Sequence, residues 1–172
     1  SEAVRPTSNR TREALFNILI GGRLPFDIHG SQLIDACAGS GSLGLEALSR
    51  GATGAVFCEW DRDALLVLKK NIQKLGFDHQ AKILSGDITN VRNWHAPAAQ
   101  LVLCDAPYDS GLTTKIIPRL AGLGALRANC IIACEVRHSE SVSLPDEFVP
   151  LDTRRYGMAR LFFFNYQPVQ LR

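Results

Sequence analysis

Short apolar runs alternate with amphipathic stretches over most of the chain. Runs of the first kind predict buried strands, and amphipathic stretches predict the helices that cover them. Strands are expected at residues 32–38, 55–60, 81–86, 101–105 and 130–136. Helices are expected between them at residues 42–50, 61–75 and 112–123. This alternation indicates an α/β fold with a parallel sheet and helices on both of its faces.

The pattern changes after Val136. Residues 148–156 and 158–167 are strand-like and are separated only by Gly157, with no helix between them. Such a pair predicts an antiparallel hairpin at the edge of the sheet. The predicted fold is therefore a mostly parallel, seven-stranded sheet with an antiparallel C-terminal hairpin.

One further helix is expected before the first strand, at residues 11–20, with Leu15 and Leu19 on its apolar face. Asn9 or Thr11 is the expected N-cap, because both side chains can accept a backbone hydrogen bond. In the helix at 112–123 we expect a disturbance at Pro118, since proline lacks the N–H that a helix interior needs.

The composition, 172 residues with 46% hydrophobic and 21% charged, indicates one soluble globular domain spanning residues 1–172. It excludes a disordered chain. No apolar run is long enough to cross a membrane, and the polar N-terminus has no signal-peptide core, so a cytoplasmic protein without a membrane partner is expected. Cys130 and Cys134 have a metal-like spacing, but there is no second pair, so no metal site is predicted.

Basic residues are concentrated at the two ends of the chain, although the net charge is only +2. Residues 1–23 hold four arginines and two glutamates, and residues 150–172 hold four arginines and one aspartate. If both ends lie beside one cleft, they form a basic rim suited to phosphates. The alternative is an ordinary solvated surface.

A strand runs directly into a glycine turn and a helix within residues 35–44, Asp-Ala-Cys-Ala-Gly-Ser-Gly-Ser-Leu-Gly. Gly39, Gly41 and Gly44 match G-x-G-x-x-G, a pattern in which backbone N–H groups approach a ligand closely. A purely structural turn would need the same residues. Asp35, just before the turn, suits a ligand with a cationic or hydroxyl-bearing part.

The next two strands also end in acidic residues. Glu59 lies where a carboxylate can accept both hydroxyls of a ribose, and Asp61 either joins it or only caps the following helix. Asp87 ends the third strand and could accept from an adenine amino group. Carboxylates at one edge of the sheet indicate a ligand that contains a nucleoside.

The fourth strand ends in Asp105-Ala106-Pro107-Tyr108. A carboxylate and a backbone carbonyl can accept hydrogen bonds from an exocyclic amine while an aromatic ring stacks on its base. This combination indicates methyl transfer to a base amine. The alternative is an Asp-Pro turn with Tyr108 packed on the core.

Together these elements resemble the class I S-adenosylmethionine-dependent methyltransferases, whose Rossmann-like fold matches the predicted sheet. The block Arg5-Pro6-Thr7, residues 10–19 and residues 35–50 resemble more narrowly the RsmD family. That family comprises bacterial 16S ribosomal RNA guanine-N2 methyltransferases. The resemblance covers residues 5–166 and implies an RNA methyltransferase that acts on 16S ribosomal RNA or the small ribosomal subunit. A monomer is expected.

The resemblance also implies a role for individual residues. The cofactor S-adenosylmethionine would be bound by Asp35, Ala38, Gly39, Gly41, Glu59, Asp61, Asp87 and Ile88. The target amine would be held by Asp105, Ala106, Pro107 and Tyr108, and RNA phosphates would be contacted by Arg5, Arg10 and Arg12.

Two departures from the family pattern stand out. Ala106 replaces the first of two prolines, and the N-terminal hairpin of the family is expected to be absent from this chain. Other readings remain open: methylation of DNA adenine or of a protein glutamine amide, a non-catalytic RNA-binding relative, or a nicotinamide-dependent oxidoreductase.

Overall fold

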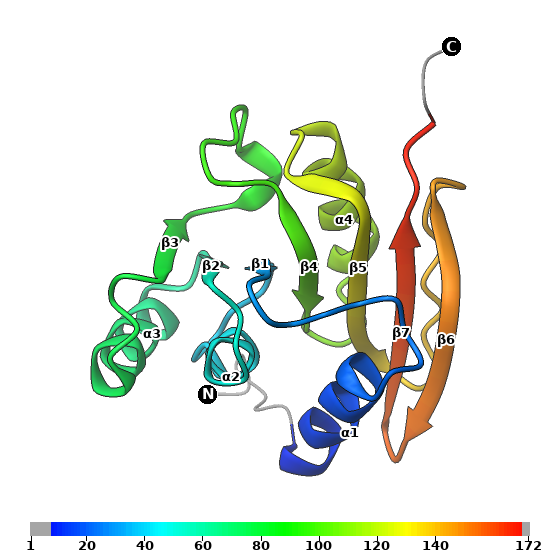
Figure 1. Cartoon of the computed structure of the whole chain (residues 1–172), viewed down its shortest axis with the longest axis horizontal. Coiled ribbons are helices and arrows are strands. Elements are labelled where there is room, and N and C mark those ends of the chain that lie inside the picture. The colour runs from blue at the N-terminus through cyan, green and yellow to red at the C-terminus, as the bar shows by residue number, and fades with distance from the viewer. Residues whose placement is uncertain (1–7, 170–172) are drawn as a thin grey trace.

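A single sheet contains all seven strands, in the order β3-β2-β1-β4-β5-β7-β6 (Figure 1). The computed structural model is described here for residues 8–169. The strands are β1 (Gln32–Asp35), β2 (Gly54–Glu59), β3 (Ala81–Ser85), β4 (Ala99–Cys104), β5 (Leu126–Arg137), β6 (Phe148–Tyr156) and β7 (Ala159–Tyr166). β1 to β5 are parallel, whereas β7 is antiparallel to both β5 and β6. The predicted sheet and its antiparallel C-terminal hairpin are confirmed.

Helices cover both faces of this sheet, as predicted. They are α1 (Asn9–Ile20), α2 (Ser42–Ser49), α3 (Arg62–Leu75) and α4 (Leu112–Gly122), with a 3-10 turn η1 (Ile88–Asn90). Apolar residues of α1, α2 and α3 pack on one face, while those of α4 and η1 pack on the other. A strand contributes side chains to both hydrophobic cores, because successive side chains point to opposite faces of the sheet. Leu33 thus belongs to the first core and Ile34 to the second.

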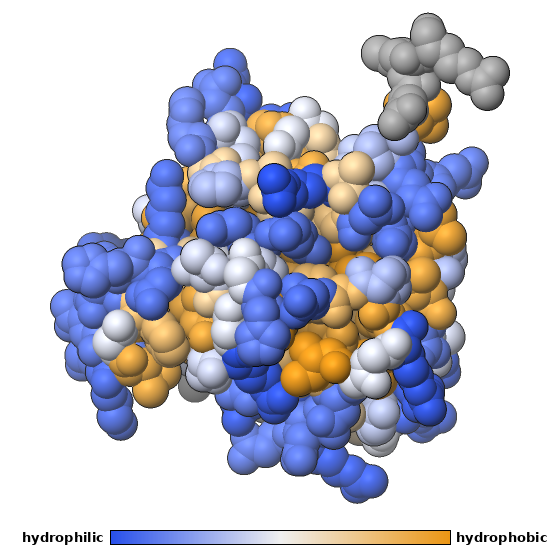
Figure 2. All heavy atoms as spheres, in the orientation of Figure 1, coloured by the Kyte–Doolittle hydropathy of each residue, from blue (hydrophilic) through white to orange (hydrophobic). Residues whose placement is uncertain are grey.

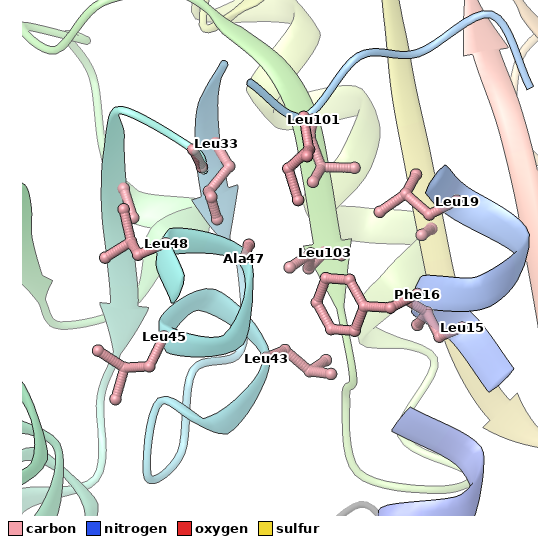
Figure 3. Close-up of a cluster of buried hydrophobic side chains, with 14 of the residues drawn as sticks. Leu15, Phe16, Leu19, Leu33, Leu43, Leu45, Ala47, Leu48, Leu101 and Leu103 are labelled. Carbon is pink, nitrogen blue, oxygen red and sulfur yellow. The ribbon is translucent and has the colours of Figure 1, made fainter. Parts of the chain in front are cut away.

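The first core fixes α1 and α2 over the middle of the sheet. On the face of the molecule seen in Figure 2, hydrophilic side chains predominate, with apolar ones scattered among them. Inside, Phe16 of α1 is fully buried and lies near Leu103 of β4 and Leu43 of α2 (Figure 3). Burying a phenylalanine of this kind contributes about 1.5–3 kcal/mol. Packing therefore holds the N-terminal helix against the same strands that carry the predicted site.

Three local expectations are corrected. α1 begins at Asn9 with Ser8 as its N-cap, because Ser8 Oγ accepts from Thr11 N at 3.1 Å; the predicted caps Asn9 and Thr11 are wrong. β1 ends at Asp35 and not at residue 38, because the chain turns there. α4 runs through Pro118 without interruption.

All five cysteines are buried with free thiols. Burial raises the pKa of Cys58 to about 12 and also raises that of Cys130, so both behave as small apolar residues. Within residues 8–169 no group of three or more His, Cys, Asp or Glu side chains could hold a metal ion. No helix in the same range is long and apolar enough to span a membrane.

The turn before α2 is closely packed at Gly41. Gly41 has φ +87°, and a Cβ there would lie 2.5 Å from Leu68 Cδ1, a side chain that is fully buried. Gly76 has a similar φ of +75° with open space around it. Gly76→Ala should cost about 1–2 kcal/mol for left-handed backbone alone. In urea unfolding, Gly41→Ala should lower the free energy of unfolding by clearly more than Gly76→Ala does. Equal losses in the two variants would contradict close packing of Leu68 against Gly41.

Candidate active site at the carboxyl edge of the sheet

The glycine turn places backbone groups at the carboxyl end of β1. Gly39 has φ +55°, and a Cβ at this position would have no atom within 4 Å, so the turn leaves room beside it. Gly41 is the N-cap of α2, and its N–H donates to Ala38 O at 2.8 Å. From α3, Asn71 Nδ2 donates to Ser40 O at 2.8 Å. The turn is therefore held in shape and remains open to a ligand next to Gly39.

Asp35 lies beneath this turn and is almost fully buried, at 1% exposure. Its Oδ2 accepts from Gly44 N at 3.0 Å, in the first turn of α2. Burial raises the pKa of Asp35 to about 7. Its Oδ1 is buried and has no hydrogen-bond partner among the described residues. The side chain thus anchors α2 and retains one acceptor, which suits a cationic group.

Glu59 ties the second strand to the glycine turn. Its Oε1 accepts from Gly39 N at 2.8 Å, and its Oε2 accepts from Trp60 N and Asp61 N, each at 2.9 Å. The residue is only 6% exposed. Three N–H donors satisfy much of the carboxylate, which has about four lone-pair sites. The sequence predicts only a ribose contact for Glu59, and the structure adds a positioning role.

The remaining residues predicted for the nucleoside lie along the same edge. Asp61 caps α3, because its Oδ2 accepts from Ala64 N at 2.9 Å. Asp87 is exposed, and its Oδ1 accepts from Thr89 N and Thr89 Oγ1, bonds that lower the pKa of Asp87. Ile88 is buried beneath it. These residues line the edge, and a role for each in ligand binding stays a prediction.

Trp60 is a further residue at this edge, for which the sequence pattern predicts no role. It directly follows Glu59 and is 44% exposed, which is unusual for so large an apolar ring. An indole face at this edge could stack on a purine. The only feature of the sequence that could have indicated this role is the position of Trp60 next to Glu59, at the end of a predicted strand.

Asp105 to Tyr108 form the loop that follows β4. Ala106 is buried at 3% exposure, Pro107 is exposed, and Asp105 and Tyr108 are half-buried. The register of β1 with β4 aligns Asp35 with Leu103, and the acceptor loop 105–108 begins two residues after Leu103, directly after the end of β4. The structure therefore brings the two predicted halves of the site to neighbouring strands.

Two residues of β5, for which the sequence pattern predicts no role, lie near the end of this strand. The guanidinium of Arg137 lies over the Tyr108 ring, 4.9 Å from its centroid, and Arg137 Nε is 3.0 Å from Asp109 Oδ2. Glu135 is buried at 1% exposure and directly follows Cys134, which pairs with Cys104, the residue before Asp105. A further acidic residue thus belongs to the strand beside β4, near the end of their pairing.

The predicted RNA-binding arginines do not share one surface. Arg10 is exposed, whereas Arg12 is half-buried and its Nη2 donates to Asn9 Oδ1 at 3.0 Å. Two residues apart on a helix, the side chains point about 200° away from each other. Arg5 lies outside the described residues.

Comparison with known proteins identifies relatives of this arrangement. The model of a family described as "Conserved hypothetical protein 95" matches residues 1–165. Ribosomal RNA small subunit methyltransferase D of Haemophilus influenzae is 34% identical over 161 residues, which cover 92% of this chain and 81% of the relative. The protein of the same name from Escherichia coli is 36% identical over 135 residues, covering 78% of this chain and 65% of the relative.

Solved structures agree with the fold. A crystal structure of a candidate methylase from Haemophilus influenzae has a TM-score of 0.78 at 30% identity, covering 95% of this chain and 100% of that chain. An RNA methyltransferase from Salinibacter ruber, in complex with S-adenosyl-L-homocysteine, has a TM-score of 0.73 at 15% identity and covers 97% of both chains. At that identity the second likeness concerns the fold alone.

The buried carboxyl of Asp35 predicts a pH-dependent stability. Because its pKa rises from 3.8 to about 7 on folding, its contribution to stability is complete below about pH 4 and is lost as the pH rises through 7. Cys104 and Glu59 lie close to it and raise its pKa further. Asp35→Asn keeps an acceptor for Gly44 N but cannot ionise.

From pH 5 to 8, the free energy of unfolding of the wild type should therefore fall relative to Asp35→Asn by about 2.5–3 kcal/mol, because about two pH units at ~1.36 kcal/mol each lie between pH 5 and the folded-state pKa of about 7. Urea unfolding at each pH measures the difference. Parallel pH profiles for the two proteins would contradict an elevated pKa of Asp35.

Proposed function

Because the chain belongs to the RsmD family of ribosomal RNA methyltransferases, we propose that it transfers a methyl group from S-adenosylmethionine to guanine N2 of 16S ribosomal RNA. One observation carries the proposal: the glycine turn after β1 and the acceptor loop after β4 follow adjacent parallel strands, aligned at Asp35 and Leu103. A nucleoside cofactor and a base amine can thereby meet at one edge of the sheet.

The residues at the glycine turn fit the cofactor. The free Oδ1 of Asp35 suits the cationic methionine end, and Gly39 leaves space beside the turn. The backbone of Ala38 and Gly41 would complete this part of the site. Glu59 and Asp61 would receive the ribose, and Asp87 with Ile88 the adenine. S-adenosylmethionine supplies an electrophilic methyl group on a sulfonium, so transfer to an amine requires neither a metal nor a covalent enzyme intermediate.

The acceptor loop would orient the guanine. A base amine is a weak nucleophile because its lone pair is delocalised into the ring. The Asp105 carboxylate and the Ala106 carbonyl would accept hydrogen bonds from the amine N–H groups and stabilise the positive charge that develops there. Pro107 limits the flexibility of the loop. The base would stack on the face of Tyr108 that Arg137 leaves uncovered.

The RNA substrate receives support from the curated relatives, whose names specify the small ribosomal subunit RNA. Exposed Arg10 and half-buried Arg12 supply positive charge at the start of α1, and Arg5 precedes them in the sequence. We propose a monomer that works in the cytoplasm, where this RNA is made. Tritium transfer from labelled cofactor to naked 16S RNA, small subunits, DNA and protein, followed by nucleoside analysis, tests the acceptor. A labelled adenine or glutamine amide, without N2-methylguanosine, would refute the proposal.

Asp105→Ala should lower methyl transfer by about 100-fold to 1000-fold, because it removes an acceptor at a site of developing charge. Cofactor affinity, measured by titration calorimetry, should stay within a few fold. Tyr108→Phe keeps the stacking face and should be mild, whereas Tyr108→Ala should lose about 1–3 kcal/mol of stacking. Wild-type rates in Asp105→Ala would rule out the mechanism.

Glu59→Ala should weaken cofactor binding by about 10-fold to 100-fold, because it removes ribose hydrogen bonds and releases Gly39 N. Asp63→Ala is the matched control, an exposed acidic residue in the first turn of α3. Calorimetry gives the affinities, and urea unfolding shows whether each variant is folded. If both variants bind cofactor like the wild type, Glu59 is not a ligand.

A further inference from the structure

A groove of about 460 Å³ separates α1 from the end of β6, outside the site described above. Its lining includes Arg10, Glu13, Arg23, Arg154 and Tyr156. Hydrophilic side chains surround α1 and the lower end of the hairpin in Figure 2, with only a small apolar patch among them. The volume lies within the range of about 300–1,000 Å³ that is typical of ligand sites.

The groove is electropositive. Three arginines line it against a single glutamate. Arg154 Nε lies 3.3 Å from Asp152 Oδ2, so its charge is partly compensated. Arg10 and Arg23 are exposed, and neither forms an ion pair within residues 8–169. Guanidinium groups bind phosphate through paired N–H donors, so two uncompensated arginines favour a polyanion.

The groove adjoins the acceptor loop through the hairpin. Tyr156 pairs with Ala159, Ala159 pairs with Arg137, and Arg137 covers the Tyr108 ring. Two strand spacings of about 4.8 Å place Tyr156 roughly 10 Å from Arg137 along the sheet. Tyr156 packs against the core on the α1 side, the face to which Arg137 also belongs by strand alternation. Both therefore face the same side of the sheet.

We propose that this groove binds the phosphate backbone of the RNA strand that flanks the target nucleotide. Arg10 and Arg23 hold phosphates, Arg154 adds a third contact, and Tyr156 forms the wall nearest the acceptor loop. The assignment rests on the proposed function, because it takes RNA to be the substrate.

The length of the groove agrees with a strand of several nucleotides. α1 has 12 residues and is therefore about 18 Å long at ~1.5 Å per residue. Arg10 lies in its first turn, and Arg23 follows its C-terminal end. About five stacked nucleotides, at ~3.4 Å each, would span that distance. The two arginines thus contact phosphates at different points along one strand.

Binding of naked 16S RNA, measured against salt concentration with S-adenosylhomocysteine present, tests the groove. Two double variants are compared: the groove pair, Arg10→Ala/Arg23→Ala, and the control pair, Lys115→Ala/Arg127→Ala. The control pair removes the same charge from exposed positions on α4 and at the amino end of β5, away from the site. Since each lost phosphate contact changes the slope of log K against log salt by about 0.7–0.9, the groove pair should be shallower by about 1.4–1.8.

The control pair should keep the wild-type slope. Equal slopes for the wild type and the groove pair, or the same loss in both pairs, would overturn the assignment. Methyl transfer by the wild type is measured separately on the same RNA. RNA binding that depends on the groove, without any transfer to this RNA or to small subunits, would refute the proposed function and would still support the groove.

Discussion

The Glu59 carboxylate is the interaction on which the cofactor half of the site depends. It accepts from Gly39 N on one side and from Trp60 N and Asp61 N on the other, so it joins the turn after β1 to the turn after β2. Backbone N–H groups at a buried turn need such partners, and a charged acceptor satisfies them more strongly than a neutral one. The residue that is proposed to receive the ribose therefore also shapes the turn that is proposed to receive the methionine part. Loss of its charge would affect both parts of the cofactor site together.

The acceptor half is organised differently, by a side chain from the neighbouring strand. Arg137 of β5 lies over Tyr108 and bonds to Asp109, a non-glycine residue held at φ +60°. A residue in that conformation has a backbone cost that the surrounding contacts must offset. A cation over the ring also fixes which face of Tyr108 is available for stacking. Ala106 has no ring that would restrict its backbone as in a proline, so these contacts supply order to the loop.

Both halves lie beside the positive charge of α1 and the C-terminal hairpin. The middle of the sequence is more acidic, and its carboxylates line the sheet edge at Asp35, Glu59 and Asp105. Phosphates are repelled there and attracted to the arginines of the groove. This separation would keep the RNA backbone outside the site while a single base enters it. Arg10 and Arg154 line one groove only because α1 packs beside the hairpin.

The sequence alone determines the order and type of the helices and strands, because hydrophobic periodicity is a local property. For example, the predicted strand at 148–156 agrees with the observed β6. The presence of Asp35 and Glu59 at one edge also follows, because parallel strands align their carboxyl ends. Only the tertiary structure decides that Glu59 bonds to Gly39, 20 residues away, and that Arg137 covers Tyr108. Those contacts depend on strand order and side-chain direction, which no local pattern encodes. The groove between α1 and β6 has the same origin, because it joins the two ends of the chain through packing.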